Sequence, residues 1–411
     1  MPSTPVSRRH FLGGAAAVGG AVLTGCTSEA PVVPAAEAEP SATKVTDPGD
    51  GILVLVNLDG GNDGLNTVCP VTDGRYRSLR GSLALDPAKT HEMSEGFVLH
   101  PSLTSFKRMW DAGNLGVVHG VGFEGLDRSH FHCRDVWQAA RSERVTTGWL
   151  GRWLDDTGGD ALTAVAVDRL LPLVLRGETN SGGVVPSGAF MLPDMAALGD
   201  SVALMAGVDS RRSDLASAVA RSTADLLEVV DVVSPVLGEE RSGSDEIGNP
   251  EGLTAKLDAV AALISAGVAT RVFTVQLGGF DTHAGQGNVN GSHANLLRQF
   301  GDALRAFYTD LKRQENDGRV LTMCFSEFGR RVGQNASGGT DHDTAAPMFL
   351  FGPMVKRGVI GDHPSLRDLD NGDLKYKIDF RTVYAGILED WLSADSKEIL
   401  RARYRPLSVL A

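Results

Sequence analysis

Residues 51–63 have the sequence GILVLVNLDGGND, in which an apolar run from Ile52 to Leu58 ends abruptly in acidic residues and glycines. The same arrangement recurs at residues 271–283 (RVFTVQLGGFDTH) and at residues 318–331 (GRVLTMCFSEFGRR). Continuous apolar runs of this length are typical of strands that are buried on both faces of a parallel sheet. Three strands are therefore predicted, each followed directly by a polar loop.

Helices are predicted elsewhere from apolar residues at helical spacing. Segments 213–233 and 253–267 have such a pattern, and Ser292 is a candidate N-cap for a third helix. The apolar stripe of that third helix is Leu296, Leu297, Phe300, Leu304, Phe307, Tyr308 and Leu311. Strands that alternate with helices predict an α/β fold, a doubly wound, mostly parallel sheet with helices on both faces. In such sheets ligands bind beyond the carboxyl ends of the strands, where the polar loops would meet.

The N-terminal segment indicates export. Arg8 and Arg9 stand in the stretch SRRHFL, which has the twin-arginine form of an export signal, and a weakly apolar run from Gly13 to Val22 follows. That run is too short to span a bilayer as a mature helix, and it fits the middle region of a cleavable signal. The export machinery that recognises such a signal is accordingly an expected partner.

Cys26 ends the stretch LTGC, directly after the apolar run, and resembles the lipidation site of an exported lipoprotein. The alternative is an ordinary signal that is cut near this point, with Cys26 discarded. We favour residues 1–26 as a signal with a lipobox, because the cysteine falls where the apolar run ends. Residues 27–50 are rich in Ala, Pro, Glu, Ser and Thr, which predicts a flexible tether. Residues 51–411 would then form a single domain on the extracytoplasmic side of the cell envelope, held to the membrane only by a lipid anchor.

The chain is acidic, with 51 Asp and Glu residues against 39 Lys and Arg residues and a formal net charge of −12. No basic run interrupts this acidity, so a nucleic-acid partner is not expected, and metal cations are more natural partners. Beyond Cys26 the chain contains Cys69, Cys133 and Cys324, each in an apolar setting and none in a CxxC pair. We expect buried thiols, with one disulfide as the alternative.

Asp281 and His283 are the first candidate metal ligands. They are two residues apart, so both side chains project to the same side of an extended segment. The alternative is a turn with a solvated histidine. We favour metal ligands because Gly278 and Gly279, directly before them, allow the backbone and an ion to approach closely.

Asp341 and His342 are the second candidate pair, in the stretch SGGTDHDTAAP at residues 337–347. Adjacent residues face one ion only in a tight loop, which the preceding glycine pair supplies. A carboxylate with an imidazole suits zinc, manganese or iron. Asp343 is interpreted either as a partner that orients the His342 imidazole or as a solvated residue.

Ser129 precedes a helix-like segment that begins with His130. A helix N-cap is the plain interpretation, but a nucleophile at a helix N-terminus would gain from the helix dipole and from free N–H groups. The same groups suit an anionic phosphoryl or sulfuryl group. His130 and His132 are interpreted either as ligands or as core residues, and the sequence does not separate these roles.

Asp59 ends the first predicted strand. An acid at a strand end of this fold favours a metal ligand over a structural turn. Arginines near the other polar loops are candidates to clamp the anion that a nucleophile would attack, and they are Arg128, Arg330 and Arg331.

Taken together, these stretches resemble a known family. LDGGNDGLNT, RSHF, GWLGRWLD, VQLGGFDTHAGQ, FSEFGRR and GTDHD are similar to the exported bacterial family known as domain of unknown function 1501. The resemblance extends from about Gly51 to the C-terminal stretch DFRTVYAGILEDWL. That family is grouped with the alkaline phosphatase and sulfatase superfamily. Members of the superfamily hold one or two metal ions at the strand ends of an α/β sheet and use a Ser, Thr or Cys nucleophile, so the resemblance implies an alkaline phosphatase-like fold.

By position, the resemblance places the superfamily's metal ligands on Asp59, Asp281, His283, Asp341 and His342. Ser129 takes the place of the nucleophile, and His363 lies where a last histidine ligand is expected. The chain departs from the superfamily pattern, because it spaces its Asp and His by two residues where the superfamily uses four. A Gly-rich loop also precedes Asp341. These departures leave two alternatives: Glu327 is a ligand, or the second metal is missing.

The hypothesis that follows is an exported, lipid-anchored, metal-dependent hydrolase of phosphate or sulfate esters. Ser129 would be its nucleophile and Arg330 its anion-binding residue, with one or two divalent ions, namely zinc, manganese, iron or calcium, as cofactors. The substrate would be a small-molecule or glycan ester. The alternative is a non-catalytic surface lipoprotein of the same fold that binds an envelope polysaccharide or a protein partner.

Overall fold

The computed structural model describes residues 51–94, 96–188, 215–238 and 252–411. The expectations for Arg8, Arg9, Cys26 and the tether lie outside these residues. The three strands expected from the apolar runs are confirmed with their bounds unchanged, as β1 (Ile52–Leu58), β8 (Val272–Leu277) and β9 (Val320–Phe325).

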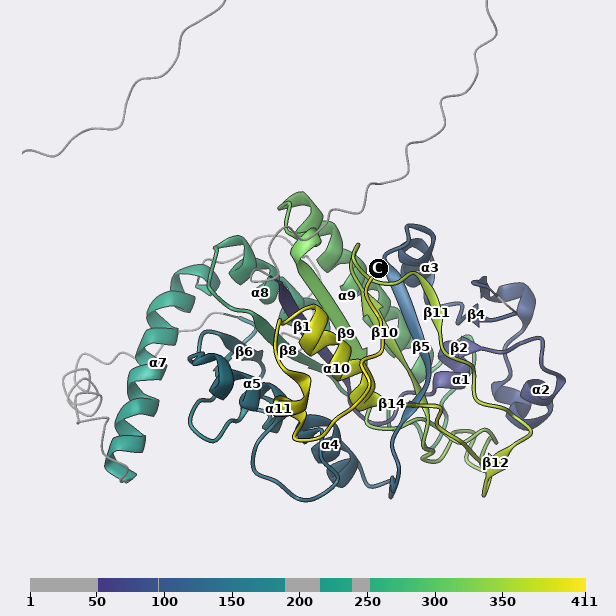
Figure 1. Cartoon of the computed structure of the whole chain (residues 1–411). Helices are drawn as coiled ribbons and strands as arrows, with labels where there is room; N and C mark the ends of the chain where they lie inside the picture. Colours follow the sequence, from purple (N-terminus) through teal and green to yellow (C-terminus); the bar gives the residue numbers. More distant parts are fainter. Residues whose placement is uncertain (1–50, 95, 189–214, 239–251) are drawn as a thin grey trace, which may run out of the picture. The chain divides into compact units, whose positions relative to one another are not determined.

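These three strands lie in a sheet of nine strands (Figure 1). Along the sheet the order is β11 (Gly358–Ile360), β5 (Leu115–Gly122), β10 (Ala346–Phe351), β9, β1, β8, β6 (Ala164–Val167) and β7 (Gly183–Val185), and β14 (Ile378–Asp379) also pairs with β5. Among the described strands of this sheet, every pairing is parallel except the two that β10 makes with β5 and β9. The predicted mostly parallel sheet is confirmed.

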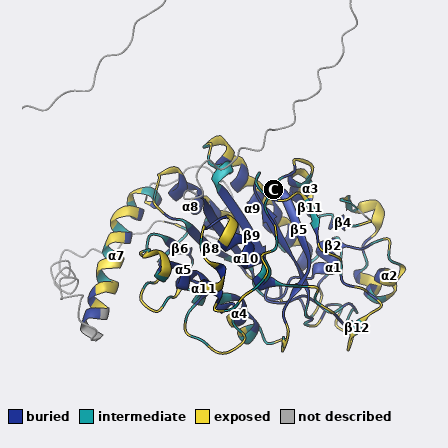
Figure 2. Ribbon diagram, in the orientation of Figure 1, coloured by how far each residue is buried: buried dark blue, intermediate teal, exposed yellow. Residues whose placement is uncertain are grey.

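Both faces of the sheet are covered by helices, because alternate residues of β1 enter two different cores. One core takes Ile52, Val54, Val56 and Leu58, and the other takes Leu53 and Leu55. The first core is closed by α3 (Thr104–Asp111), α7 (Leu215–Leu237), α8 (Leu253–Ser265) and α9 (Ser292–Arg313). The second is closed by α4 (His130–Ala139), α5 (Trp149–Thr157), α10 (Phe380–Asp390) and α11 (Ser396–Leu400). The buried strands form the dark blue centre of Figure 2.

Smaller elements cover one end of this sheet. They are α1 (Gly64–Thr67), α2 (Gly74–Arg80), a three-stranded sheet of β2 (Val68–Cys69), β4 (Val98–Leu99) and β3 (His91–Glu92), and a two-stranded sheet of β12 (Leu369–Asp370) and β13 (Asp373–Leu374). Short 3₁₀ turns occupy Gly81–Leu83, Pro87–Lys89, Leu173–Leu175 and Asp317–Arg319.

Two local expectations can be compared with the structure. Ser292 was expected to cap α9, but the cap residue is Gly291, and Ser292 is the first residue of the helix. Its hydroxyl donates instead to the carbonyl oxygen of Gln286 at 3.4 Å. The three cysteines after Cys26 are buried free thiols, as expected. Among the described helices, none is long and apolar enough to span a membrane.

Candidate metal centre

Several polar loops meet at one edge of the sheet. Because β1, β8 and β9 are parallel neighbours, their carboxyl ends lie side by side. The loops that follow them carry Asp59 after β1, Asp281 and His283 after β8, and Glu327 after β9. Strand β5 runs in the same direction, since both it and β9 are antiparallel to β10, and α4 follows β5 with His130 as its first residue.

Strand β10 explains why Asp341 and His342 reach the same edge. Because β10 is antiparallel to β9, the residues just before Ala346 lie where β9 ends. The Gly-rich loop before Asp341 therefore reverses the direction of the chain. It brings Asp341 and His342 back to the edge where the other loops lie.

Four side chains converge within this edge. Donor atoms of His130, Asp281 and His342 all lie within 4.8 Å of one another. From Oδ1 of Asp281, the Nε2 atoms of His130, His283 and His342 lie at 3.4, 3.1 and 3.1 Å. The Nε2 atoms of His283 and His342 are 2.9 Å apart. These four residues are called the histidine cluster below.

Each imidazole of the histidine cluster is held through its Nδ1 atom. The partners are Oε1 of Glu327 for His130 (2.7 Å), Oδ1 of Asp341 for His283 (3.1 Å) and the carbonyl oxygen of Arg128 for His342 (2.8 Å). Because carboxylate and carbonyl oxygens only accept, Nδ1 carries the proton in each ring. A neutral imidazole then presents a lone pair at Nε2.

Three imidazole lone pairs and one carboxylate oxygen thus face a common point. Nε2 of His130 is buried and makes no hydrogen bond within the described part of the chain. Acceptors at these separations repel one another unless a proton or a cation lies between them. Imidazole and carboxylate are ligands that zinc accepts, and a hydrogen bond on the far ring nitrogen is usual for metal-bound histidine. The residues present therefore fit a divalent ion.

Arg330 fixes Asp281 in this arrangement. Its side chain is 1% exposed, and Nη2 donates to Oδ1 of Asp281 at 2.5 Å. The same guanidinium donates to the carbonyl oxygens of Gly61 (2.7 Å) and Thr340 (2.8 Å). Burial alone would raise the pKa of Asp281, but the hydrogen bond and the positive charge of Arg330 outweigh burial, and the pKa is lowered to about 2. The expectation that Arg330 meets a substrate anion does not fit this burial, because its donors already have partners.

Neither Glu327 nor Asp59 contributes an atom to the histidine cluster. Oε1 of Glu327 is buried and accepts from the backbone N–H of Gly60 at 2.9 Å as well as from His130. Asp59 accepts from Nη1 of Arg134 at 3.2 Å. Burial, and then the negative charge of Glu327, raise the pKa of Asp59. The structure thus makes Glu327 an outer partner of His130, and Asp59 a partner of Arg134.

Asp341 and Asp343 flank His342 and differ in environment. Asp341 is half-exposed and accepts from Nδ2 of Asn335 at 3.1 Å and from His283. The hydrogen bond from Asn335 lowers the pKa of Asp341. Asp343 is fully buried, accepts from the backbone N–H of Leu374 at 2.9 Å, and has a pKa well above its ordinary value because of that burial. Both expectations for Asp343 are wrong: it is not solvated, and the Arg128 carbonyl holds His342 instead.

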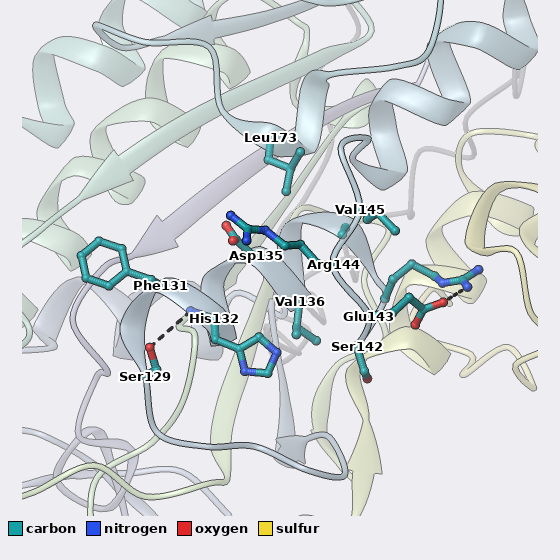
Figure 3. Close-up of a pocket in the computed structure, with 12 residues that line it drawn as sticks. Ser129, Phe131, His132, Asp135, Val136, Ser142, Glu143, Arg144, Val145 and Leu173 are labelled. Atoms are coloured by element: carbon teal, nitrogen blue, oxygen red, sulfur yellow. Dashed lines mark hydrogen bonds and ion pairs between the residues drawn. The ribbon is translucent and has the colours of Figure 1, made fainter.

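Ser129 and His132 lie at a different pocket from the histidine cluster. The Ser129 hydroxyl accepts from the backbone N–H of His132 at 3.4 Å, as a helix cap does. Both residues line a pocket of about 330 Å³ beside α4 (Figure 3). Nδ1 of His132 donates to Asp127 at 2.8 Å. Residues two apart on a helix point to nearly opposite sides, so His130 enters the cluster while His132 does not.

A larger, open pocket of about 600 Å³ adjoins the histidine cluster. Its lining consists of Arg128, His283, Arg331, Asp341, His342 and Asn371. Arg128 and Arg331 both form ion pairs with the buried Asp373, Arg331 through Nε at 2.8 Å. Two guanidinium groups that line a pocket next to a cation site suit an anionic ligand.

Arg128 has two roles in this region, one through its backbone and one through its side chain. Its backbone has φ +63°, which is uncommon for a residue with a side chain and typical of functional turns. Its carbonyl oxygen accepts from His342, while its side chain lines the open pocket. The sequence indicates a role only for the Arg128 side chain, since the backbone role depends on a turn that no local pattern indicates.

His363 does not join the histidine cluster. Its ring packs against His119 and Phe97, with centroid separations of 5.1 and 5.0 Å, and its Nδ1 donates to the carbonyl oxygen of Pro364. The third imidazole beside His283 and His342 is His130. Its signal in the sequence was its place at the start of a helix after an apolar run, and that signal did not separate it from His132.

Comparison with known families identifies the family of the chain and an export signal. The family described as "Protein of unknown function (DUF1501)" matches residues 192–402, which is half of the chain, and the protein belongs to this family. The twin-arginine translocation pathway signal sequence matches residues 5–25 and indicates export. No curated protein matches the chain.

Several solved structures match the chain at low identity and with low TM-scores. The PsFucS1 sulfatase from Pseudoalteromonas sp. is 10% identical, with a TM-score of 0.40, and 88% of this chain and 73% of that chain are covered. The C-terminal periplasmic domain of EcEptC from Escherichia coli, in complex with Zn, is 10% identical, with a TM-score of 0.35, and 74% and 73% are covered. Wild-type alkaline phosphatase PafA is 11% identical, with a TM-score of 0.32, and 68% and 63% are covered. Likeness at this level carries no argument about the residues of the site.

Proposed function

We propose that this protein is a metal-dependent hydrolase of phosphate or sulfate esters that works outside the cytoplasm. The observation that carries the proposal is the convergence of three imidazole Nε2 atoms on Oδ1 of Asp281, beside an open pocket with two arginines. The signal at residues 5–25 supports the location. We also propose that Cys26 is lipidated and that the substrate is a glycan ester.

The residues of the histidine cluster would hold the ion. Glu327, Asp341 and the Arg128 carbonyl keep the three rings in the tautomer that ligation needs. Arg330 keeps Asp281 ionised and in place. A bound divalent ion would supply charge stabilisation and lower the pKa of a coordinated hydroxyl group.

The open pocket would hold the anionic end of the ester. Arg128 and Arg331 line it, and Asp373 restrains both guanidinium groups, which limits the conformational entropy lost on binding. The formal net charge of −12 would disfavour an anion over most of the surface, so a local pair of arginines gives the pocket its selectivity.

Ser129 is the proposed nucleophile, and its hydroxyl would turn from the pocket beside α4 toward the neighbouring histidine cluster when the ester binds. It stands at the N-terminus of α4, directly before His130, where the helix dipole favours a developing negative charge. Its hydroxyl would attack phosphorus or sulfur, the bond to the ester oxygen would break, and the alcohol would leave. Water would then release phosphate or sulfate from the serine. The long 3.4 Å cap contact costs little to exchange for this role.

The test combines metal analysis with ester hydrolysis on the purified protein. We expect about one equivalent of zinc, manganese or iron per chain, and hydrolysis of p-nitrophenyl phosphate or p-nitrophenyl sulfate. His130→Ala should lose the metal and the activity. His132→Ala is the matched control, the same residue type two positions along the same helix, and should keep both. Ser129→Ala should keep the metal and lose the activity.

Two outcomes would count against the proposal. A wild-type protein that takes up no metal after reloading would remove the hydrolase mechanism. A protein that holds metal through His130 but hydrolyses neither ester would favour a metal-containing surface protein that binds an envelope polysaccharide or a protein partner.

A further inference from the structure

A buried glutamine joins the two loops that supply most of the histidine cluster. Thr282 lies between Asp281 and His283, and Thr340 lies directly before Asp341 and His342. The hydroxyl groups of both threonines donate to one atom, Oε1 of Gln286, at 3.1 Å from Thr282 and 2.7 Å from Thr340. The exposed fractions are 5% for Thr282, 0% for Gln286 and 0% for Thr340.

The orientation of the Gln286 amide is determined by its other neighbour. Nε2 of Gln286 lies 2.5 Å from Oδ2 of Asp63, and a carboxylate only accepts, so the nitrogen must face Asp63 and the oxygen must face the threonines. Asp63 is in turn held by Nη1 and Nη2 of Arg80 at 2.5 and 2.8 Å. The bridge is therefore anchored to a buried ion pair between Asp63, in the loop after β1, and Arg80, at the end of α2.

The same two loops touch through their backbones. The N–H of Thr340 donates to the carbonyl oxygen of Thr282 at 3.2 Å, and the N–H of Gln286 donates to the carbonyl oxygen of Gly338 at 3.1 Å. A Cβ on Gly339 would lie 2.4 Å from the carbonyl carbon and oxygen of His283. Little space remains between the loops, and the bridge adds its two threonine hydrogen bonds to these backbone contacts.

We propose that Gln286 is a positioning residue that sets the distance between the loop of Asp281 and His283 and the loop of His342, and thereby the affinity of the centre for a metal ion. This role rests on the proposed metal centre. Asn335 and Arg330 also cross between these loops, but Asn335 is only half-buried and Arg330 contacts Asp281 itself. Gln286 is buried and accepts hydrogen bonds from Thr282 and Thr340 rather than from the side chains of the histidine cluster. It therefore acts on each ligand loop through the threonine in that loop.

The test removes the two hydroxyl groups without changing the shape of the side chains. In the full chain stripped of metal, Thr282→Val and Thr340→Val, singly and together, are titrated with Zn²⁺ alone by calorimetry. Outer partners of metal ligands typically affect affinity by about 10–100-fold, and we expect a loss in this range for the double variant. Thr340→Ser keeps the hydroxyl and should keep wild-type affinity.

Thr274→Val is the matched control, a buried threonine of β8 outside the bridge. The metal-free single variants should melt at temperatures close to that of this control, so that weaker zinc binding is not a sign of unfolding. Zinc affinity in both single variants equal to that of the control would overturn the positioning role and leave the metal centre intact. A wild-type chain that binds no zinc would overturn the metal centre itself, and the positioning role with it.

Discussion

Asp63 and Asp281 both follow parallel strands of the same sheet, and they differ in how many donors they meet. Asp63 is fully buried and has four hydrogen-bond donors, two from Arg80, one from Gln286 and the backbone N–H of Asn66. Asp281 is about half-exposed and has Arg330 as its main donor, while three imidazole nitrogens crowd the same oxygen. A carboxylate matched by protein donors holds the fold together, whereas a carboxylate among other acceptors marks a place for a cation.

Breaking the Asp63 pair should have the largest effect on stability. Asp63→Asn leaves Arg80 buried without a counter-charge, which typically costs about 3–5 kcal/mol. Urea unfolding measures the loss. Asp111→Asn, which removes an exposed pair with Lys107, is the control and should cost about 0.5 kcal/mol or less. Equal stability of the two variants would show that Asp63 does not hold the fold together.

Gly339→Ala tests the close contact between the ligand loops. Its Cβ would meet backbone atoms of His283 at 2.4 Å, so the loops must separate, at a cost of about 1–3 kcal/mol and with weaker zinc binding. Gly278→Ala is the control, because a Cβ there meets no atom within 4 Å. Calorimetric titration with Zn²⁺ and thermal unfolding should distinguish the two variants. Identical behaviour would mean that the loop spacing does not matter.

The pH dependence of stability should reveal the lowered pKa of Asp63. Burial raises its pKa, but the charges of Arg80 and His293 and the hydrogen bonds of Arg80 and Gln286 outweigh burial and hold it below its ordinary value of 3.8. A lowered folded-state pKa stabilises the protein above about pH 4, and this contribution is lost as the pH falls through the folded-state value. Urea midpoints from pH 5 to pH 2 should fall less steeply for Asp63→Asn than for wild type. A parallel fall would contradict this assignment.

Arg128→Gly should have the smallest effect on stability. It tests whether the Arg128 side chain in the open pocket binds an anion. Glycine accepts φ +63° without strain and keeps the carbonyl that holds His342, so stability should change by less than about 1 kcal/mol and zinc binding should persist. The pocket loses one of its two guanidinium groups, so competitive inhibition by inorganic phosphate should weaken. Unchanged phosphate inhibition would show that Arg128 does not face the anion.

Much of the fold could be predicted, because burial on both faces leaves a strong pattern in a strand. The runs that became β1, β8 and β9 were unbroken and ended in polar residues, so their carboxyl edge and the loops bearing Asp281 and His283 could be located. Asp341 and His342 could be recognised as a pair by residue type. Which edge they reach depends on β10 running antiparallel to β9, and that is set by pairing rather than by local pattern.

The sequence by itself determined the export signal, the α/β class and most of the residue types that gather at the strand ends, because these depend on local composition and spacing. Only the tertiary structure separated His130 from His132, buried Asp343, engaged Arg330 with Asp281 and made the Arg128 carbonyl a partner of His342. Each of these outcomes depends on which atom of a distant segment lies within about 3 Å, and hydrogen-bond contacts of that range are fixed by packing across the sheet edge.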